Sequence, residues 1–284
     1  MLSQLTQLSS GSMRSDHLPA TMVERVAIIR NIAGDLTVLQ ANSIENDLKI
    51  VNYFGITGIG KSFAVANIFH AFKETYPIVW LDFDTTQAAR LDSLYTWKEV
   101  LDTLRQIPPL QFTPDTINLS NHEQRSLGSV PVLFRVVNLD VIAAKPLILL
   151  LDHLDDLNYW MWRQAAILQP FVGQHKALAI CMSQTPLLWH SYSLSDRCTE
   201  RRVEPFVIHE TSAFMRHFDL DLFTQVAQDV AHGHPLRLFY LLRLFEQEWR
   251  FNDHIEPIPI TTLQQTLPPD VFAIISLYRN AAAL

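Results

Sequence analysis

The stretch GITGIGKS, residues 55–62, fits the pattern G-x-x-x-x-G-K-[ST] and carries one additional glycine, Gly58, inside it. A phosphate chain needs several backbone N–H groups pointed at it, and glycine lets the backbone curl that tightly without a Cβ clash. In this pattern Lys61 reaches the β- and γ-phosphates, and the Ser62 hydroxyl can bind Mg²⁺. The stretch therefore predicts a phosphate-binding P-loop.

The residues on either side of the loop support this interpretation. Residues 49–54 form a short apolar run that indicates a strand, and residues 63–72 are apolar at helical spacing. A helix that begins at the loop adds its positive N-terminal end to the phosphate site. The loop residues expected to contact a nucleotide are Gly55, Thr57, Gly58, Ile59, Gly60, Lys61, Ser62 and Phe63.

Composition narrows the class of protein. The chain has 284 residues, 48% of them hydrophobic, and a net charge of −7, which argues against a protein that coats nucleic acid but leaves room for a local basic groove. The two cysteines, Cys181 and Cys198, lack the spacing of a zinc site and favour a reducing compartment. No apolar run has the length of a membrane helix, and residues 1–16 do not resemble a signal peptide. We expect a cytoplasmic protein that does not enter a membrane.

Apolar runs at 77–83, 147–151 and 177–182 predict further strands. Helical spacing is found in segments 21–34, 88–106 and 131–143, and segment 107–130 is polar and rich in proline, which indicates a long loop. Strands that alternate with helices predict a parallel sheet with helices on both faces.

After residue 211 the strand pattern stops and helical patterns continue. The predicted fold is therefore an α/β parallel P-loop NTPase sheet followed by a small all-helical lid domain. The expected divisions are a disordered lead-in over 1–20, the P-loop NTPase domain over 21–208, and the lid with the start of a possible further domain over 209–284.

A P-loop needs carboxylates from another strand, one to hold Mg²⁺ and one to orient the attacking water. The run at 147–151 ends in Asp152-His153-Leu154-Asp155-Asp156, which makes Asp152 the candidate metal ligand. Asp155 or Asp156 is the candidate catalytic carboxylate, although either could instead cap the following helix. For His153 a packed or solvent-facing position is favoured over a ligand role.

Two further segments bear on the site. At the end of the strand 177–182, Ser183 or Gln184 could contact the γ-phosphate, or the segment could be a simple turn before Pro186. The sequence Gly233-His234-Pro235 precedes an apolar periodic segment and predicts the start of a helix.

The order of these segments resembles the STAND class of P-loop NTPases, which includes the NACHT and NB-ARC modules, over residues 45–250. The resemblance implies that Asp152 serves Mg²⁺, that Asp156 is the usual catalytic candidate, and that Pro235 lies against the nucleotide base. Gln184 stands where that class often has arginine, which implies slow hydrolysis. Only the segment 251–284 follows, without a recognisable winged helix or sensor array, so the chain is either a fragment or works with separate effector or sensor proteins.

The leading hypothesis is an ATP-binding and ATP-hydrolysing switch, with ATP or ADP and Mg²⁺ as cofactors, whose nucleotide state controls self-association or partner assembly. In this ATPase the catalytic candidates are Lys61, Asp155 and Asp156. The alternative is an AAA+-like motor or loader that acts as a ring on DNA or protein. A small-molecule kinase is disfavoured because nothing after the P-loop suggests an arginine-rich acceptor lid.

ATP is favoured over GTP because no guanine-recognition signature occurs in a suitable place. A ring-forming motor would also need an arginine supplied by a neighbouring subunit. The sequence does not choose among the candidates, which are Arg90, Arg125, Arg135, Arg163, Arg197, Arg201 and Arg202.

Overall fold

The structure is a computed structural model of the whole chain. It describes residues 23–41, 48–84, 94–106, 121–154, 166–172, 176–187, 194–217, 220–221 and 224–241. The chain separates into two compact units, one of residues 1–56 and 61–203, and one of residues 57–60 and 204–284. Among the described residues, no helix combines the length and the apolarity that crossing a membrane requires.

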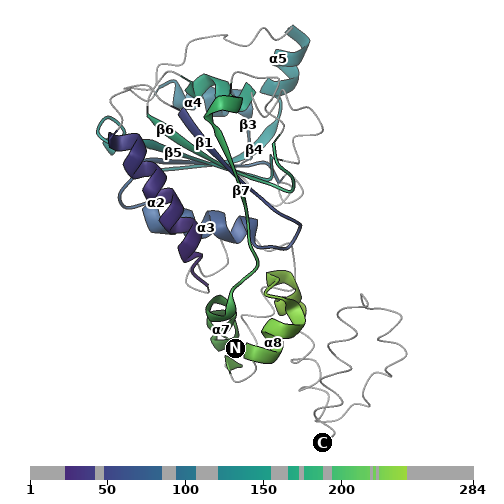
Figure 1. Cartoon of the computed structure of the whole chain (residues 1–284). Coiled ribbons are helices and arrows are strands. Elements are labelled where there is room, and N and C mark those ends of the chain that lie inside the picture. The colour runs from purple at the N-terminus through teal and green to yellow at the C-terminus, as the bar shows by residue number, and fades with distance from the viewer. Residues whose placement is uncertain are drawn as a thin grey trace, which may run out of the picture. The chain divides into compact units, whose positions relative to one another are not determined.

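The first unit is built on a seven-stranded sheet with the order β3-β4-β2-β5-β6-β1-β7 (Figure 1). The strands are β1 (Leu48–Phe54), β2 (Ile78–Asp82), β3 (Leu94–Thr96), β4 (Pro131–Val137), β5 (Leu147–Asp152), β6 (Ala177–Ser183) and β7 (Cys198–Arg202). From β2 to β7 each neighbouring pair is parallel, whereas β4 runs antiparallel to both β2 and β3.

The helices of this unit are α2 (Val26–Ala41), α3 (Lys61–Phe72), α4 (Trp97–Leu104) and α5 (Asn121–Gly128), with short 3₁₀ helices η2 (Leu139–Val141), η4 (Gln169–Phe171) and η6 (Ser195–Arg197). Figure 1 shows α2 and α3 on one side of the sheet and α4 on the other. Phe69 of α3 packs against Trp80 of β2, with 5.3 Å between the ring centroids, and Trp97 of α4 belongs to the core on the opposite face.

The central strands β5 and β6 are buried along their whole length. This burial is what helices on both faces require, and it explains why their sequences are continuous apolar runs rather than alternating ones. The predicted α/β fold with helices on both faces of a mainly parallel sheet is therefore confirmed, and β4 and β3 add an antiparallel edge to it.

Some predicted element boundaries were wrong. Segment 131–143 contains the antiparallel strand β4 instead of a helix, because Pro131 begins an apolar and β-branched run that fits a strand near the edge of a sheet. Segment 88–106, predicted as one helix, contains β3 and the shorter α4, while the predicted loop 107–130 contains α5. The first helix extends to Ala41 and has Gly34 in its interior.

The start of α4 is fixed by a capping box. The Thr96 hydroxyl accepts a hydrogen bond from Glu99 N at 3.3 Å, and the Glu99 carboxylate accepts one from Thr96 N at 2.7 Å. These reciprocal bonds satisfy backbone donors that a helix start leaves without partners. The chain therefore turns directly from the end of β3 into α4.

Helix α2 and the edge strand β7 are joined to β1 by an ion cluster. Arg201 donates to both carboxylate oxygens of Asp35, at 2.6 and 3.0 Å, and to the Tyr53 hydroxyl at 3.2 Å. Lys49 lies 2.8 Å from the same carboxylate. Burial of Asp35 acts to raise its pKa, but the contacts with Arg201 and Lys49 outweigh it and lower the pKa. Arg201 thus has an ionic partner in its own chain.

The second unit contains α7 (Ile208–Arg216), α8 (Thr224–Ala231) and helical residues 235–241. Gly233 joins α8 to the last helical segment with φ of 68°. Its carbonyl accepts a hydrogen bond from Phe206 N at 2.7 Å, and Gln228 Nε2 donates to Phe206 O at 3.2 Å. These bonds hold the segment before α7 against the end of α8.

Gly233 and Gly34 provide a matched pair of substitutions. A Cβ on Gly233 would lie 2.0 Å from Phe206 O in a left-handed conformation, so Gly233→Ala is expected to destabilise the second unit by more than about 1–2 kcal/mol. A Cβ on Gly34 meets nothing within 4 Å, so Gly34→Ala is expected to stabilise α2 by about 0.5–1 kcal/mol. Denaturant unfolding followed by circular dichroism measures both, and equal effects would contradict the described backbone.

Candidate nucleotide and metal site

The P-loop connects β1 to α3. Gly58 and Gly60 have φ of 79° and 92°, a conformation that side chains rarely adopt, and this accounts for glycine at both positions. Helix α3 begins at Lys61, whose Nζ donates to Gly55 O at 2.8 Å and to Ile56 O at 3.3 Å. The ammonium group therefore lies over the backbone of its own loop, and its contact with phosphate stays a prediction.

The beginning of the loop is tied to the neighbouring strand. Gly55 N donates to Ser183 O at 3.1 Å, which joins the loop to the carboxyl end of β6. The Ser183 hydroxyl is buried, 2.9 Å from Asn52 Nδ2 and 2.6 Å from Thr185 O. It therefore anchors the end of β6 to β1, while Gln184 beside it is exposed. The γ-phosphate contact of Gln184 stays a prediction.

Two aspartates end neighbouring strands at the same edge of the sheet. Asp82 is the last residue of β2 and Asp152 the last of β5, and they are paired in the parallel register. Asp152 is only 1% exposed. The carboxyl ends of parallel strands are where α/β sheets bind ligands, so both carboxylates are placed for site chemistry.

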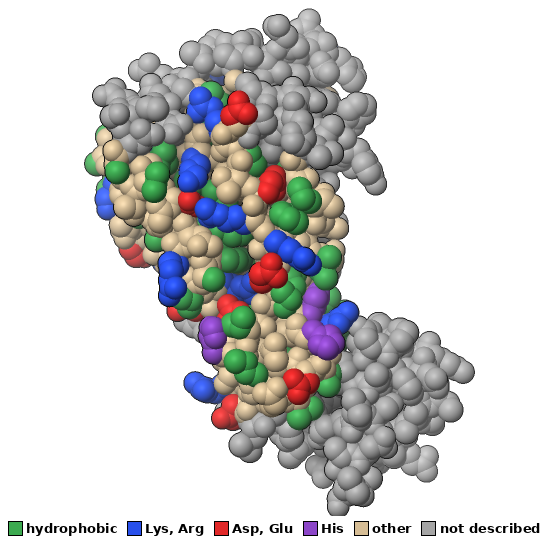
Figure 2. Space-filling model, in the orientation of Figure 1, with side chains coloured by type: hydrophobic (Ala, Val, Ile, Leu, Met, Phe, Trp, Pro, Cys, Tyr) green, Lys and Arg blue, Asp and Glu red, His purple; other side chains and the backbone are tan. Residues whose placement is uncertain are grey.

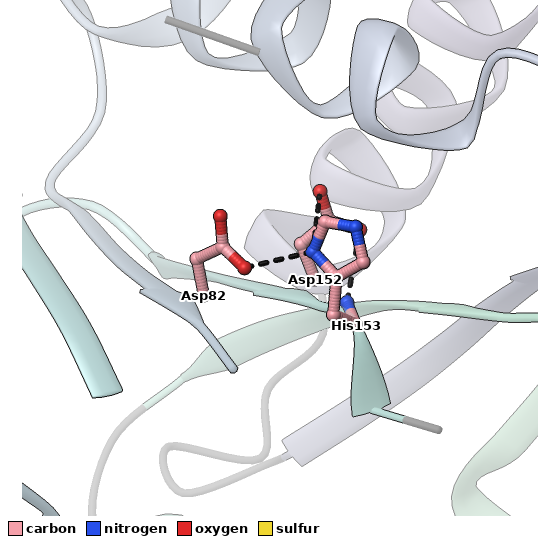
Figure 3. Close-up of side chains that lie close together, drawn as sticks. All are labelled: Asp82, Asp152 and His153. Carbon is pink, nitrogen blue, oxygen red and sulfur yellow. Dashed lines mark hydrogen bonds and ion pairs between the residues drawn. The ribbon is translucent and has the colours of Figure 1, made fainter. Parts of the chain in front are cut away.

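The imidazole of His153 lies between these carboxylates (Figure 3). Its Nδ1 is 2.8 Å from Asp82 Oδ1 and 3.7 Å from Asp152 Oδ2, and its Nε2 is 3.3 Å from Ser62 Oγ. His153 has φ of 55°, in the left-handed region that is uncommon for a histidine. Instead of the packed or solvent-facing position favoured from the sequence, His153 connects both strand ends to the first turn of α3.

The pKa values in this cluster are coupled to the geometry. Burial raises the pKa of Asp152 to about 6. The charge of Asp82 acts in the same direction, whereas His153 and the nearby Ser62 hydroxyl act in the opposite one. Burial by itself would lower the pKa of His153, but the hydrogen bond to Asp82 and the charge of Asp152 raise it to about 9. The position of the His153 imidazole between Asp82 and Asp152 therefore favours its protonated form.

Among the described residues, one buried atom of the cluster accepts no hydrogen bond of good geometry. Asp152 Oδ1 accepts a bond from His153 N at 3.0 Å, whereas the buried Oδ2 accepts none. A buried acceptor without a hydrogen bond is costly, and a cation satisfies a carboxylate oxygen well. The donor set of Ser62 and Asp152 thus fits the Mg²⁺ that the P-loop implies.

The other predicted site residues lie outside the cluster formed by Asp82, Asp152 and His153. Asp155 and Asp156 lie outside the described residues, as do Arg90 and Arg163. Phe63 is buried in α3. Within the second unit, Leu236 N donates to Gly58 O at 3.2 Å, and Pro235 Cγ is 3.5 Å from the place of a Cβ on Gly60. The helical segment that begins at Pro235 therefore contacts the loop glycines.

Two residues of this cluster, Asp82 and His153, are not among the site residues predicted from the sequence. Asp82 lies in the predicted strand 77–83 but has no predicted role in the site. For His153 the sequence favours a packed or solvent-facing position over a ligand role. A usable signal was present, because an aspartate lies close to the end of each of two predicted parallel strands, Asp82 in 77–83 and Asp152 directly after 147–151. What the sequence lacks is the strand order, which makes β2 and β5 neighbours.

A pH-dependent contribution to stability follows from the raised pKa of His153. A histidine whose pKa is raised in the folded state contributes its full stabilisation below the unfolded pKa, about 6.5, and loses it as the pH rises through about 9. His153→Asn is therefore expected to lower the free energy of unfolding at pH 6 and to have little effect at pH 10, in chelator-treated protein.

His70 of α3 is the control, because burial lowers its pKa. His70→Asn should not reproduce a destabilisation that disappears with rising pH. Denaturant titrations across this pH range measure the difference. An equal cost of His153→Asn at both pH values would show that the imidazole is not charged in the cluster.

No protein-family model matches the sequence, and no curated protein matches it. Solved structures do resemble the chain. The Orc1 protein of Aeropyrum pernix, solved in complex with DNA, is 15% identical with a TM-score of 0.47, covering 93% of this chain and 67% of that one. Cdc6p from Pyrobaculum aerophilum is 13% identical with a TM-score of 0.44, covering 91% and 73%.

Domain III of the replication initiation protein DnaA from Thermotoga maritima is 10% identical with a TM-score of 0.38, covering 87% of this chain and 90% of that one. These three proteins are AAA+ ATPases of the P-loop class. The narrower resemblance to STAND proteins has no counterpart among them. Identities and TM-scores this low assign neither a substrate nor a partner to the chain.

Proposed function

We propose that this chain binds ATP with Mg²⁺ at residues 55–62 and hydrolyses it slowly. The observation that carries the proposal is the buried Asp152 carboxylate, whose Oδ2 accepts no hydrogen bond, next to a helix that begins with Lys61 and Ser62. A glycine-rich loop alone could be a turn. A loop with a lysine at the helix start and a buried carboxylate at a nearby strand end is the combination that nucleotide chemistry requires.

Each residue has a separate role in this proposal. Lys61 exchanges its bonds to the loop carbonyls for the β- and γ-phosphates, and the N–H groups of the loop surround the same phosphates. Ser62 and Asp152 would hold Mg²⁺, which would supply positive charge next to the phosphates. Asp156 orients the attacking water, with Asp155 as the alternative, and Gln184 contacts the γ-phosphate without the positive charge of an arginine.

The finer proposal is a switch in which the nucleotide state controls self-association or the assembly of a partner. It is supported by the hydrogen bond from Leu236 N to Gly58 O, which joins the helical segment beginning at Pro235 to the phosphate loop. A nucleotide that alters the loop backbone would act on this bond. In such a switch the chain has two conformations, and the nucleotide can shift the equilibrium between them by no more than the difference in its binding free energy to the two.

The second candidate is an AAA+-like motor or loader that acts as a ring, the class to which the three similar structures belong. A ring would need an arginine from a neighbouring subunit at the nucleotide. Arg201 is paired with Asp35 in its own chain, whereas Arg202 is exposed, so Arg202 is the better candidate of the two. On the face drawn in Figure 2, Lys and Arg are interspersed with Asp and Glu, so this face does not favour a nucleic-acid partner.

Lys61→Ala tests the proposal directly. Removing the cation aimed at the phosphates is expected to weaken Mg²⁺-ATP binding about 10- to 30-fold, or about 1.4–2 kcal/mol. Lys73→Ala, just after the same helix and beside exposed Glu74, is the matched control and should bind as the wild type does. Isothermal titration calorimetry measures both affinities.

Unchanged affinity in a folded Lys61→Ala variant would remove the P-loop assignment. Turnover is tested in the same preparations with Asp156→Asn, which should slow hydrolysis and leave binding intact, since a water-orienting group acts in the transition state. Slower turnover in Asp155→Asn alone would transfer the role to that residue.

A further inference from the structure

We propose that Asp82, Asp152 and His153 form a binding site for a divalent first-row transition cation of the Fe²⁺-to-Zn²⁺ series, in preference to Mg²⁺. The proposal deepens the proposed function and rests on it for the place of the nucleotide beside the metal. Ser62 and Asp152 by themselves offer only oxygen ligands, whereas His153 adds an imidazole nitrogen. Imidazole favours zinc, cobalt and nickel, while Mg²⁺ prefers carboxylate, carbonyl and water.

The three side chains already lie close enough to share one cation. One ligand atom from each lies within 4.8 Å of the other two. Ligands about 2.0–2.2 Å from a metal lie about 3–3.5 Å from each other. The separations of His153 Nδ1 from Asp82 Oδ1, 2.8 Å, and from Asp152 Oδ2, 3.7 Å, fall on either side of that range. Cation binding would therefore need side-chain rotations and release of the Nδ1 proton that faces Asp82.

A second observation is the Asp152 carboxylate itself. It is 1% exposed, and its Oδ2, the oxygen nearer to His153 Nδ1, accepts no hydrogen bond within the described residues. Water cannot readily solvate an atom buried to this degree, so leaving it without a donor costs free energy. A cation held by Asp82 and His153 would replace the imidazolium proton as the positive partner of this oxygen.

Backbone contacts hold the carboxylates in place. The amide of His153 donates to Asp152 Oδ1 at 3.0 Å, which leaves Oδ2 facing the cluster. The amide of Asp84 donates to Asp82 Oδ1 at 2.9 Å. Hydrogen bonds of this kind orient metal ligands and strengthen binding. The cluster is thus partly organised before any cation enters.

The test is metal binding to the full chain in the absence of nucleotide, with Co²⁺, Zn²⁺ and Mg²⁺ as probes. The wild type is expected to bind Co²⁺, followed by its visible absorption, at least about tenfold more tightly than Mg²⁺, with Zn²⁺ displacing it. His153→Asn is expected to weaken Co²⁺ binding by about tenfold or more and to change Mg²⁺ binding far less. Asparagine is chosen because it tolerates the left-handed backbone of residue 153.

His70→Asn, an exposed histidine of α3, is the control for adventitious surface binding and should bind Co²⁺ as the wild type does. Pulsed electron paramagnetic resonance of bound Mn²⁺ should detect one imidazole nitrogen in the wild type and none in His153→Asn. If His153→Asn does not fold, Asp82→Asn replaces it in the comparison. This variant is also expected to weaken Co²⁺ binding.

Equal affinities for Co²⁺ and Mg²⁺ in the wild type would overturn the proposal, whatever the variants do. Undiminished Co²⁺ binding in a folded His153→Asn variant would overturn it as well. The Lys61→Ala titration separates this outcome from failure of the proposed function. Tight ATP binding without Co²⁺ preference rejects only the metal proposal, and Co²⁺ preference without ATP binding rejects only the nucleotide proposal.

Discussion

Burial of the Asp152 carboxylate at the end of β5 is the constraint on which the candidate site depends. All six residues of β5 are buried, so the strand delivers a charged group to a place from which water is largely excluded. Charge in such a place is costly unless it is paired and hydrogen-bonded. The surrounding residues pair this carboxylate only in part. The His153 amide donates a hydrogen bond to Oδ1, and the His153 imidazole lies 3.7 Å from Oδ2.

The sheet order turns this isolated carboxylate into a cluster. Because β2 lies beside β5 in parallel register, Asp82 reaches the same edge, and its hydrogen bond to His153 fixes the imidazole between the two acids. The P-loop reaches the cluster through Ser62 in the first turn of α3. P-loop and acidic residues from three separate stretches of sequence are therefore brought together at one edge of the sheet.

Much of this arrangement could be predicted from local sequence, and the failures have physical causes. The strands that end at Asp82, Asp152 and Ser183 are apolar up to those residues, because both faces of the sheet are covered, and the P-loop strand β1 is largely apolar. Such runs are readily recognised. Segment 131–143 was mistaken for a helix because apolar residues near the sheet edge do not show a clear period. The Thr96-x-x-Glu99 capping box was visible in the sequence and would have placed the start of α4 correctly.

The contacts between residues of the candidate site could not be predicted from local sequence patterns. Which strand neighbours β5 is decided by packing across the whole sheet, so the pairing of Asp82 with Asp152 has no local signature. The left-handed backbone conformation of His153 also has no local signature in the sequence, since this conformation is uncommon for histidine. Sequence thus predicts which residues are available, and the fold decides which of them meet.

The central claim is that the strand-end acids and the P-loop form one nucleotide and metal site. The most direct measurement is a crystal structure with a non-hydrolysable ATP analogue and Mn²⁺, using anomalous scattering to locate the metal. The account predicts phosphates along residues 55–62 and a manganese peak bound by Asp152 and the His153 imidazole. A peak remote from both residues, or a nucleotide bound away from the loop, would contradict it.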